Sequence, residues 1–130
     1  MTTPPPQVWP CFRARDARAM IRFLVDVVGF EEAVAYGDGD TVDHAELRWP
    51  AGGGVMLGSV RDDGGAVCPP GSFSAYVVAD DIDALHARVE AAGATIAKAP
   101  YDTDYGSRDF ALTDPEGNHW SFGTYRGHPG

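Results

Sequence analysis

The sequence predicts an α+β fold made of two tandem βαβββ modules, whose curved mixed sheets surround a cleft. Two helix-like runs carry this prediction, because each begins at an aspartate and ends thirteen residues later at a glycine, over 16–29 and 80–93. The two runs begin 64 residues apart, which is about half of the chain's 130 residues. Strand-like apolar segments precede and follow each of them, so the same structural unit occurs twice in the chain. The seam between such modules is a place where ligand sites form.

The first strand is expected at 8–13, and the first helix follows it. Asp16 is a suitable N-cap, because its carboxylate can accept hydrogen bonds from the free amides of the first turn. Gly29 can adopt the left-handed backbone that ends a helix. Apolar side chains recur at helical spacing between them and form one stripe: Ala17, Met20, Ile21, Leu24 and Val28.

The second helix begins at Asp80 or Asp81 and ends at Gly93 by the same reasoning. His86 lies off its apolar stripe, so we expect the imidazole in solvent. The stripe consists of Ile82, Leu85, Val89 and Ala92.

Strand-like runs complete both modules, bounded by glycine- and proline-rich turns. In the first module they cover 31–36, 42–49 and 54–59, and in the second 72–79, 95–97, 108–113 and 119–124. The modules therefore span 8–60 and 72–125 of a single domain at 8–125. A linker at 61–71 joins them, a flexible arm precedes them at 1–7, and a tail follows at 126–130.

The charge composition limits the classes of partner that the protein is expected to bind. The net charge of −9 and the pI of about 4.6 disfavour nucleic acid and an anionic membrane surface as partners, and are compatible with a cationic ligand. Cys11 and Cys68 have no metal-finger spacing and read as free thiols of a cytoplasmic protein. Neither a signal peptide nor an apolar run long enough to span a membrane is recognisable.

The last hairpin carries the motif Asp114-Pro-Glu-Gly-Asn-His-Trp-Ser-Phe122. Placed after a duplicated, capped helix, this motif resembles the vicinal oxygen chelate superfamily, which holds glyoxalase I, extradiol dioxygenases, and bleomycin and fosfomycin resistance proteins. The resemblance covers roughly residues 8–125. It implies a homodimer in which each cleft is built from two modules.

The resemblance also implies where a metal would bind, because enzymes of this superfamily take one His or Glu ligand from the first and last strand of each module. Those positions fall near Trp9, Leu57, Ser74 and Ser121, none of which is a usual ligand. His119 lies on the same strand face as Ser121, but one histidine cannot hold a catalytic ion. The chain is therefore closest in character to the metal-free bleomycin-resistance-like members, with no metal and no cofactor.

Aromatic side chains could stack on a planar ligand. Among them, Trp9 and Tyr76 are assigned to the cleft, whereas Trp120 and Phe122 are assigned to the core because they alternate away from His119 and Ser121. The residues expected to bind a ligand are Trp9, Cys11, Trp49, Leu57, Ser74, Tyr76, Tyr105, Arg108, His119 and Ser121.

Two functions remain open. The first is a metal-free binding protein that sequesters a small, partly aromatic ligand in a dimeric cleft. The alternative is a divergent lyase, isomerase or dioxygenase-like enzyme that uses His44, Glu46 or His119. His44 and Glu46 share one strand face, which suits an acid/base pair but is more typical of a solvated face or an ion pair.

Overall fold

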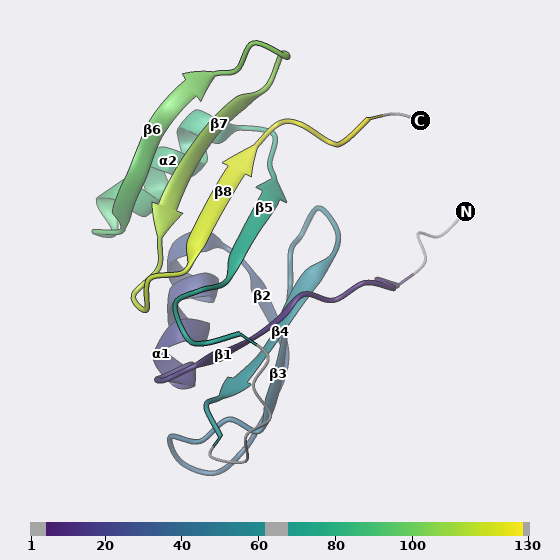
Figure 1. The fold of residues 1–130 in the computed structure, drawn as a ribbon, viewed down its shortest axis with the longest axis vertical. Coiled ribbons are helices and arrows are strands. Elements are labelled where there is room, and N and C mark those ends of the chain that lie inside the picture. The colour runs from purple at the N-terminus through teal and green to yellow at the C-terminus, as the bar shows by residue number, and fades with distance from the viewer. Residues whose placement is uncertain (1–4, 62–67, 129–130) are drawn as a thin grey trace. The chain divides into compact units, whose positions relative to one another are not determined.

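The computed structural model of the chain describes residues 5–61 and 68–128 (Figure 1). The chain divides into two compact units, Met1–Pro70 and Gly71–Gly130. Each unit contains helical structure and a four-stranded mixed sheet, which confirms the α+β prediction of two βαβββ modules. The expected arm at 1–7, linker at 61–71 and tail at 126–130 stay predictions, since they fall partly outside the described residues. Within the described chain, no helix has the length and apolarity to cross a lipid bilayer.

The first unit orders its strands β1-β4-β3-β2, with β1 parallel to β4 and the other pairs antiparallel. Its elements in chain order are β1 (Cys11–Ala14), α1 (Ala17–Arg22), η1 (Phe23–Val28), β2 (Glu31–Tyr36), β3 (His44–Arg48) and β4 (Gly54–Ser59). The first strand begins three residues later than the sequence predicts. Pro10 has no amide proton to donate to a ladder, although its carbonyl accepts from the Met56 amide at 2.9 Å.

The first helix is capped as predicted, because the Asp16 carboxylate accepts from the Ala19 amide at 3.0 Å. It is not α-helical throughout: after Arg22 the chain widens into the π-helix η1. The Leu24 carbonyl accepts from both the Gly29 and Phe30 amides, and Gly29 provides the left-handed backbone (φ 113°) that lets them converge. The predicted apolar stripe is buried, with Leu24 and Val28 at most 1 % exposed.

The second unit orders its strands β5-β8-β7-β6, with β5 parallel to β8 (Figure 1). Its elements are β5 (Ser74–Val78), α2 (Ile82–Ala91), β6 (Thr95–Asp102), β7 (Arg108–Thr113) and β8 (His119–Gly123). Strand β6 is five residues longer than the predicted 95–97 and takes in Tyr101. Because β6 is an edge strand with two register shifts, it accommodates Pro100 without loss of a central hydrogen bond.

The core of the second unit lies on the face of its sheet that α2 covers. Trp120 and Phe122 are fully buried, as predicted, and the Phe122 ring stacks on Phe110 with centroids 5.1 Å apart. Helix α2 is capped by Asp81, whose carboxylate accepts from the Ala84 amide at 3.0 Å.

Two predictions for α2 are wrong. Ala92 is exposed because the helix ends at Ala91, so the apolar stripe stops at Val89. His86 is half-buried rather than solvated: its ring meets Phe110 edge-on at 5.4 Å, because position 86 lies one turn from the buried Ile82.

The turn between β7 and β8 is organised by the buried carboxylate of Asp114, which is 4 % exposed. Its Oδ1 accepts from the amides of Glu116 and Asn118, at 2.9 and 3.0 Å. Its Oδ2 accepts from the Asn118 side-chain amide at 2.9 Å and from the Trp120 indole at 2.8 Å. One carboxylate therefore holds the turn and fixes a core tryptophan.

Candidate functional site

The register of the second sheet aligns a row of side chains on one face. Tyr76 of β5 pairs with Ser121 of β8, Ser121 with Ala111 of β7, and Ala111 with Lys98 of β6. Paired residues on neighbouring strands project to the same side of a sheet. This face is opposite to the one that carries Phe122, so it is the face that α2 leaves free.

The next row along the same face contains Gly123 of β8, Asp109 of β7 and Tyr101 of β6. Apart from Gly123, the residues of these two rows line a cavity of about 360 Å³. Tyr105, from the loop between β6 and β7, adds a third tyrosine to its lining, and His119 lies at its other end. The cavity is thus an aromatic hollow with a single buried acid.

Asp109 anchors a polar network at the floor of this cavity and is only 6 % exposed. The Tyr76 hydroxyl donates to Asp109 Oδ1 at 3.1 Å, and the Ser107 hydroxyl donates to the same oxygen at 2.5 Å. The Tyr125 amide in turn donates to the Tyr76 hydroxyl at 3.2 Å. Burial of the phenol raises the pKa of Tyr76 above its ordinary value, so this hydroxyl stays protonated and able to donate at neutral pH.

Gly123 makes the close approach of Tyr76 and Asp109 possible. A Cβ atom at position 123 would lie 2.0 Å from both the Tyr76 hydroxyl and Asp109 Oδ1. The Tyr76 phenol therefore passes over Gly123, the only glycine of β8, and reaches the Asp109 carboxylate on β7.

The rim of the cavity carries a cation. The Lys98 ammonium lies 3.9 Å from the centroid of the Tyr101 ring, within cation–π range. Tyr105 meets Tyr125 edge-on at 5.4 Å, and the His119 imidazole lies 3.1 Å from the Ser121 hydroxyl. The lining therefore combines aromatic rings with hydrogen-bonding groups.

Of the predicted site residues in the second unit, Tyr76, Tyr105, His119 and Ser121 line the cavity, whereas Ser74 and Arg108 do not. Ser74 is exposed beside His119 in the ladder.

Arg108 instead binds two carboxylates, Asp83 of α2 at 2.9 Å and Asp102 of β6 at 3.2 Å. The hydrogen bond from Arg108 lowers the pKa of Asp83, and the hydrogen bond to Asp83 raises the pKa of Arg108. This residue ties α2 to the sheet.

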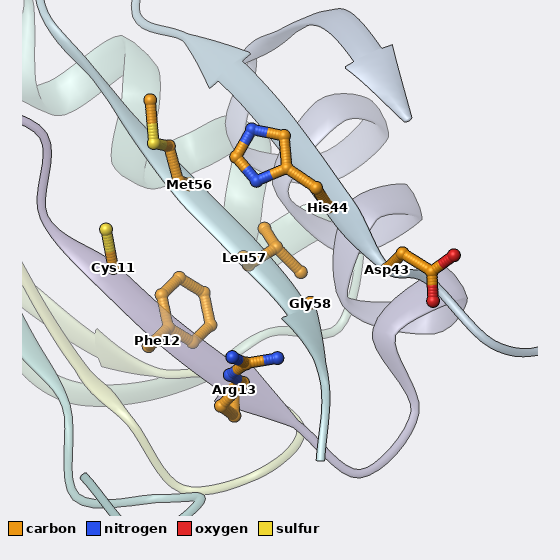
Figure 2. Close-up of a pocket in the computed structure, with 8 residues that line it drawn as sticks. All are labelled: Cys11, Phe12, Arg13, Asp43, His44, Met56, Leu57 and Gly58. Atoms are coloured by element: carbon orange, nitrogen blue, oxygen red, sulfur yellow. The ribbon is translucent and has the colours of Figure 1, made fainter. Parts of the chain in front are cut away.

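The first unit has a smaller hollow of about 150 Å³, which Figure 2 shows from the side of β1 and β4. Cys11 and Leu57, both predicted for the site, line it. Cys11 is exposed and donates to the Trp9 carbonyl at 3.3 Å, whereas Leu57 is 3 % exposed and belongs to the core. Met56, which the sequence analysis passed over, pairs with Cys11 in the ladder and projects to the same face.

The two predicted tryptophans of the first unit lie outside this hollow. Trp9 is half-buried, with the Arg48 guanidinium 5.7 Å from its ring centroid. Trp49 is half-buried against Phe30, with ring centroids 5.0 Å apart.

The metal that the superfamily implies does not fit the donors of this chain. The expected positions hold Trp9, Leu57, Ser74 and Ser121, which offer neither imidazole nor carboxylate. Over residues 5–61 and 68–128, no group of three or more His, Cys, Asp or Glu side chains lies close enough to hold an ion. His44 and Glu46 form a pair at 2.9 Å, which supplies only two ligands where a catalytic zinc site takes three from the protein.

The residues expected to bind a ligand do not include Asp109, Tyr101 or Lys98, although all three line the cavity. A signal for Asp109 was present, because it is the only acidic residue in the apolar run 108–113 and alternates with the core residue Phe110. The positions of Lys98 and Tyr101 in the cavity depend on the extra length and the register shifts of β6, which the sequence does not show.

Comparison with known proteins defines the class to which this fold and site belong. The sequence profile of the Glyoxalase/Bleomycin resistance protein/Dioxygenase superfamily matches residues 7–122. The chain belongs to this superfamily. A comparison with curated protein sequences finds no significant match.

Solved structures of the same fold include both binding proteins and enzymes. TioX from Micromonospora sp. ML1 is 28 % identical with a TM-score of 0.73, over 89 % of this chain and 97 % of its own. TnmS3, an antibiotic-binding protein from Streptomyces sp. CB03234, is 24 % identical with a TM-score of 0.69, over 90 % of this chain and 94 % of its own. A lactoylglutathione lyase from Agrobacterium tumefaciens is 24 % identical with a TM-score of 0.67, over 92 % and 94 %. At this identity the last two share the fold alone, so the function must be argued from the site.

Proposed function

We propose that the protein is a metal-free small-molecule binding protein of the glyoxalase/bleomycin-resistance type, which sequesters a partly aromatic ligand. The observation that carries this proposal is the cavity of about 360 Å³ with Tyr76, Tyr101 and Tyr105 in its lining. Its size falls within the range of small-molecule sites, and its lining combines ring faces with a few convergent polar groups.

The exposed aromatic surface of this cavity can supply the binding energy. Tyr76 is 42 % and Tyr105 60 % exposed, a large fraction for aromatic side chains, and a bound ring would cover part of both. Apolar burial stabilises a complex by about 25 cal/mol per Å² removed from water, and stacked or edge-on rings add roughly 0.5–1.5 kcal/mol a pair. A planar ligand is therefore favoured over a flexible polar one.

The proposal includes a homodimer whose cleft is built from two modules, following the pattern of the superfamily. It also places the protein in the cytoplasm, where the free thiols Cys11 and Cys68 stay reduced. TnmS3 has the same fold and is an antibiotic-binding protein, which agrees with a binding role for this fold. It does not indicate which ligand this chain binds.

The test is a substitution that fills part of the cavity with a larger side chain. Ala111 lies on the cavity face and is 6 % exposed, so Ala111→Leu adds three heavy atoms within the hollow. Ala99→Leu makes the same change on β6 at an exposed position that does not line the cavity, and serves as the matched control. Planar aromatic compounds are screened by thermal shift, and calorimetry then gives the affinity of the best one for each variant.

We expect Ala111→Leu to weaken binding at least tenfold while Ala99→Leu leaves it within about twofold. Mass spectrometry of the compound after incubation should recover it unchanged. Equal binding by Ala111→Leu and the parent would move the site elsewhere, and a converted compound would favour the enzyme alternative.

A second arm tests the predicted role of Trp9. If this indole stacks on the ligand, Trp9→Ala should weaken binding more than Glu31→Gln, which removes one exposed carboxylate. Exposed charges are screened within about 10 Å at ordinary salt, so the loss of one changes affinity little. Unchanged affinity in Trp9→Ala would exclude this indole from the site.

A further inference from the structure

We propose that Asp109 recognises a cationic nitrogen on the aromatic ligand of the second unit's cavity, so that the ligand is an aromatic amine or a similar organic cation. This inference rests on the proposed function and names the chemical class that the same cavity selects. It follows from how Asp109 is hydrogen-bonded, from what faces it, and from where Lys98 lies.

The Asp109 carboxylate is buried but only half satisfied. Both donors that reach it, the hydroxyls of Tyr76 and Ser107, bind Oδ1. Within the described part of the chain, no hydrogen bond ends on Oδ2. Because Asp109 lines the cavity and its Oδ1 is taken by two donors, Oδ2 is the oxygen left to accept from a ligand.

Within the described residues Asp109 has no directly paired cation, and Lys98 of the same cavity lining lies over the Tyr101 ring. The two donors to Asp109 are neutral hydroxyls, and the raised pKa of Tyr76 keeps the phenol in its neutral form. No ion pair within the described residues includes Asp109, although Asp83 and Asp102 of the same unit share Arg108. A carboxylate taken out of water without a counter-charge favours a cation over a neutral donor.

Lys98 already shows how a cation sits in this cavity. Its ammonium lies over the ring of Tyr101, and Tyr101 is the direct cross-strand partner of Asp109. Lys98 is exposed on a long flexible stem, so a ligand cation can displace it at small cost. The ligand cation would then lie between the Tyr101 face and the Asp109 carboxylate. The net charge of −9 favours the approach of such a ligand.

The test uses two probes of the same ring and nearly the same shape: 1-naphthylmethylamine, which is a cation at pH 7, and 1-naphthalenemethanol, which is neutral. Binding is followed by amide chemical shifts in two-dimensional NMR, reading the residues of β7 and β8. In the parent protein we expect the amine to bind about tenfold more tightly than the alcohol, which corresponds to about 1.4 kcal/mol.

Asp109→Asn isolates the charge. The asparagine carbonyl can still accept from Tyr76 and Ser107, so the network at Oδ1 is kept while the charge is removed. We expect the amine-to-alcohol preference to fall to near one, with the affinity for the alcohol changed less than about threefold. Asp104→Asn removes the same charge from an exposed position in the adjoining loop and should keep the tenfold preference.

Lys98→Met provides an independent variant that leaves the buried network untouched. It removes the resident ammonium and keeps the apolar stem, so the amine should bind about threefold more tightly and the alcohol about as before. This arm remains informative even if Asp109→Asn fails to fold.

The outcomes separate the two proposals. If both probes bind the parent equally, or if Asp104→Asn loses as much preference as Asp109→Asn, the recognition by Asp109 is refuted while aromatic binding stands. Tighter binding of the alcohol than of the amine by Lys98→Met would refute it in the same way. If neither probe perturbs the cavity amides, the proposed function fails together with this inference.

Discussion

Asp114→Asn should strongly destabilise the protein, although it changes one oxygen into one amide nitrogen. The two oxygens of this carboxylate serve four donors, two each. An asparagine keeps one acceptor oxygen and places its own NH₂ against the remaining pair. With the amide oriented to keep the turn, the side-chain amide of Asn118 and the indole of Trp120 lose their acceptor.

The magnitude follows from the burial of those donors. Asn118 is 1 % and Trp120 0 % exposed, so neither can turn to water. Each buried donor left unsatisfied costs about 1–3 kcal/mol, which gives roughly 2–6 kcal/mol for the pair. Flipping the amide only transfers the loss to the two backbone donors. A domain of this size has a stability of roughly 7–20 kcal/mol, so the variant should fold but melt at least several degrees lower.

The assay is urea denaturation followed by far-UV circular dichroism, which does not depend on the fluorescence of Trp120. Asp104→Asn, an exposed change of the same chemistry, is the control and should stay within about 0.5 kcal/mol of the parent. A difference between Asp114→Asn and the control of less than about 0.5 kcal/mol would refute the reasoning, because it would mean that the buried carboxylate does not hold the turn.

Four further predictions test the site. Gly123→Ala, whose Cβ would collide with Tyr76 and Asp109, should lower the stability by roughly 1–3 kcal/mol and abolish binding in the cavity, as measured by denaturation and calorimetry. Because the folded-state pKa of Tyr76 is raised, stability should fall as the pH rises above 10, and Tyr76→Phe should remove part of that fall in an alkaline denaturation series. Metal analysis after dialysis should find no stoichiometric transition metal; an ion lost on mutating His44 and Glu46 would contradict this. Sedimentation at micromolar concentration should give about twice the 13.9 kDa of the chain, and a persistent monomer would exclude the shared cleft.

Local sequence signals placed the elements of the fold well. The aspartate caps and glycine stops identified both helices, because capping and a left-handed glycine act within one turn of the chain. The same signals did not reveal the π-helix after Arg22 or the full length of β6. Those features depend on hydrogen bonds and register shifts that apolar periodicity does not encode.

The candidate site was predicted only in part. Tyr76, Tyr105, His119 and Ser121 are among the residues expected to bind a ligand, and all four line the cavity. Arg108 was placed near the same opening, but its guanidinium binds Asp83 and Asp102 on other elements. The carboxylate that pairs with an arginine is decided by tertiary contacts, so the residues next to Arg108 in the sequence do not predict its partners.

Residue types and their spacing were therefore enough to predict the duplicated α+β architecture and the capped helices, and to show that the expected ligand positions hold no metal donor. Only the tertiary structure brought Tyr76 and Asp109, 33 residues apart, to within 3.1 Å of each other. This hydrogen bond requires the parallel pairing of β5 with β8 and the antiparallel pairing of β8 with β7. It also requires Gly123 between them, because a side chain there would collide with both groups. Helix caps act over a few bonds along the chain, whereas strand register is set by the cooperative packing of a whole sheet, and it is register that decides which side chains share a cavity.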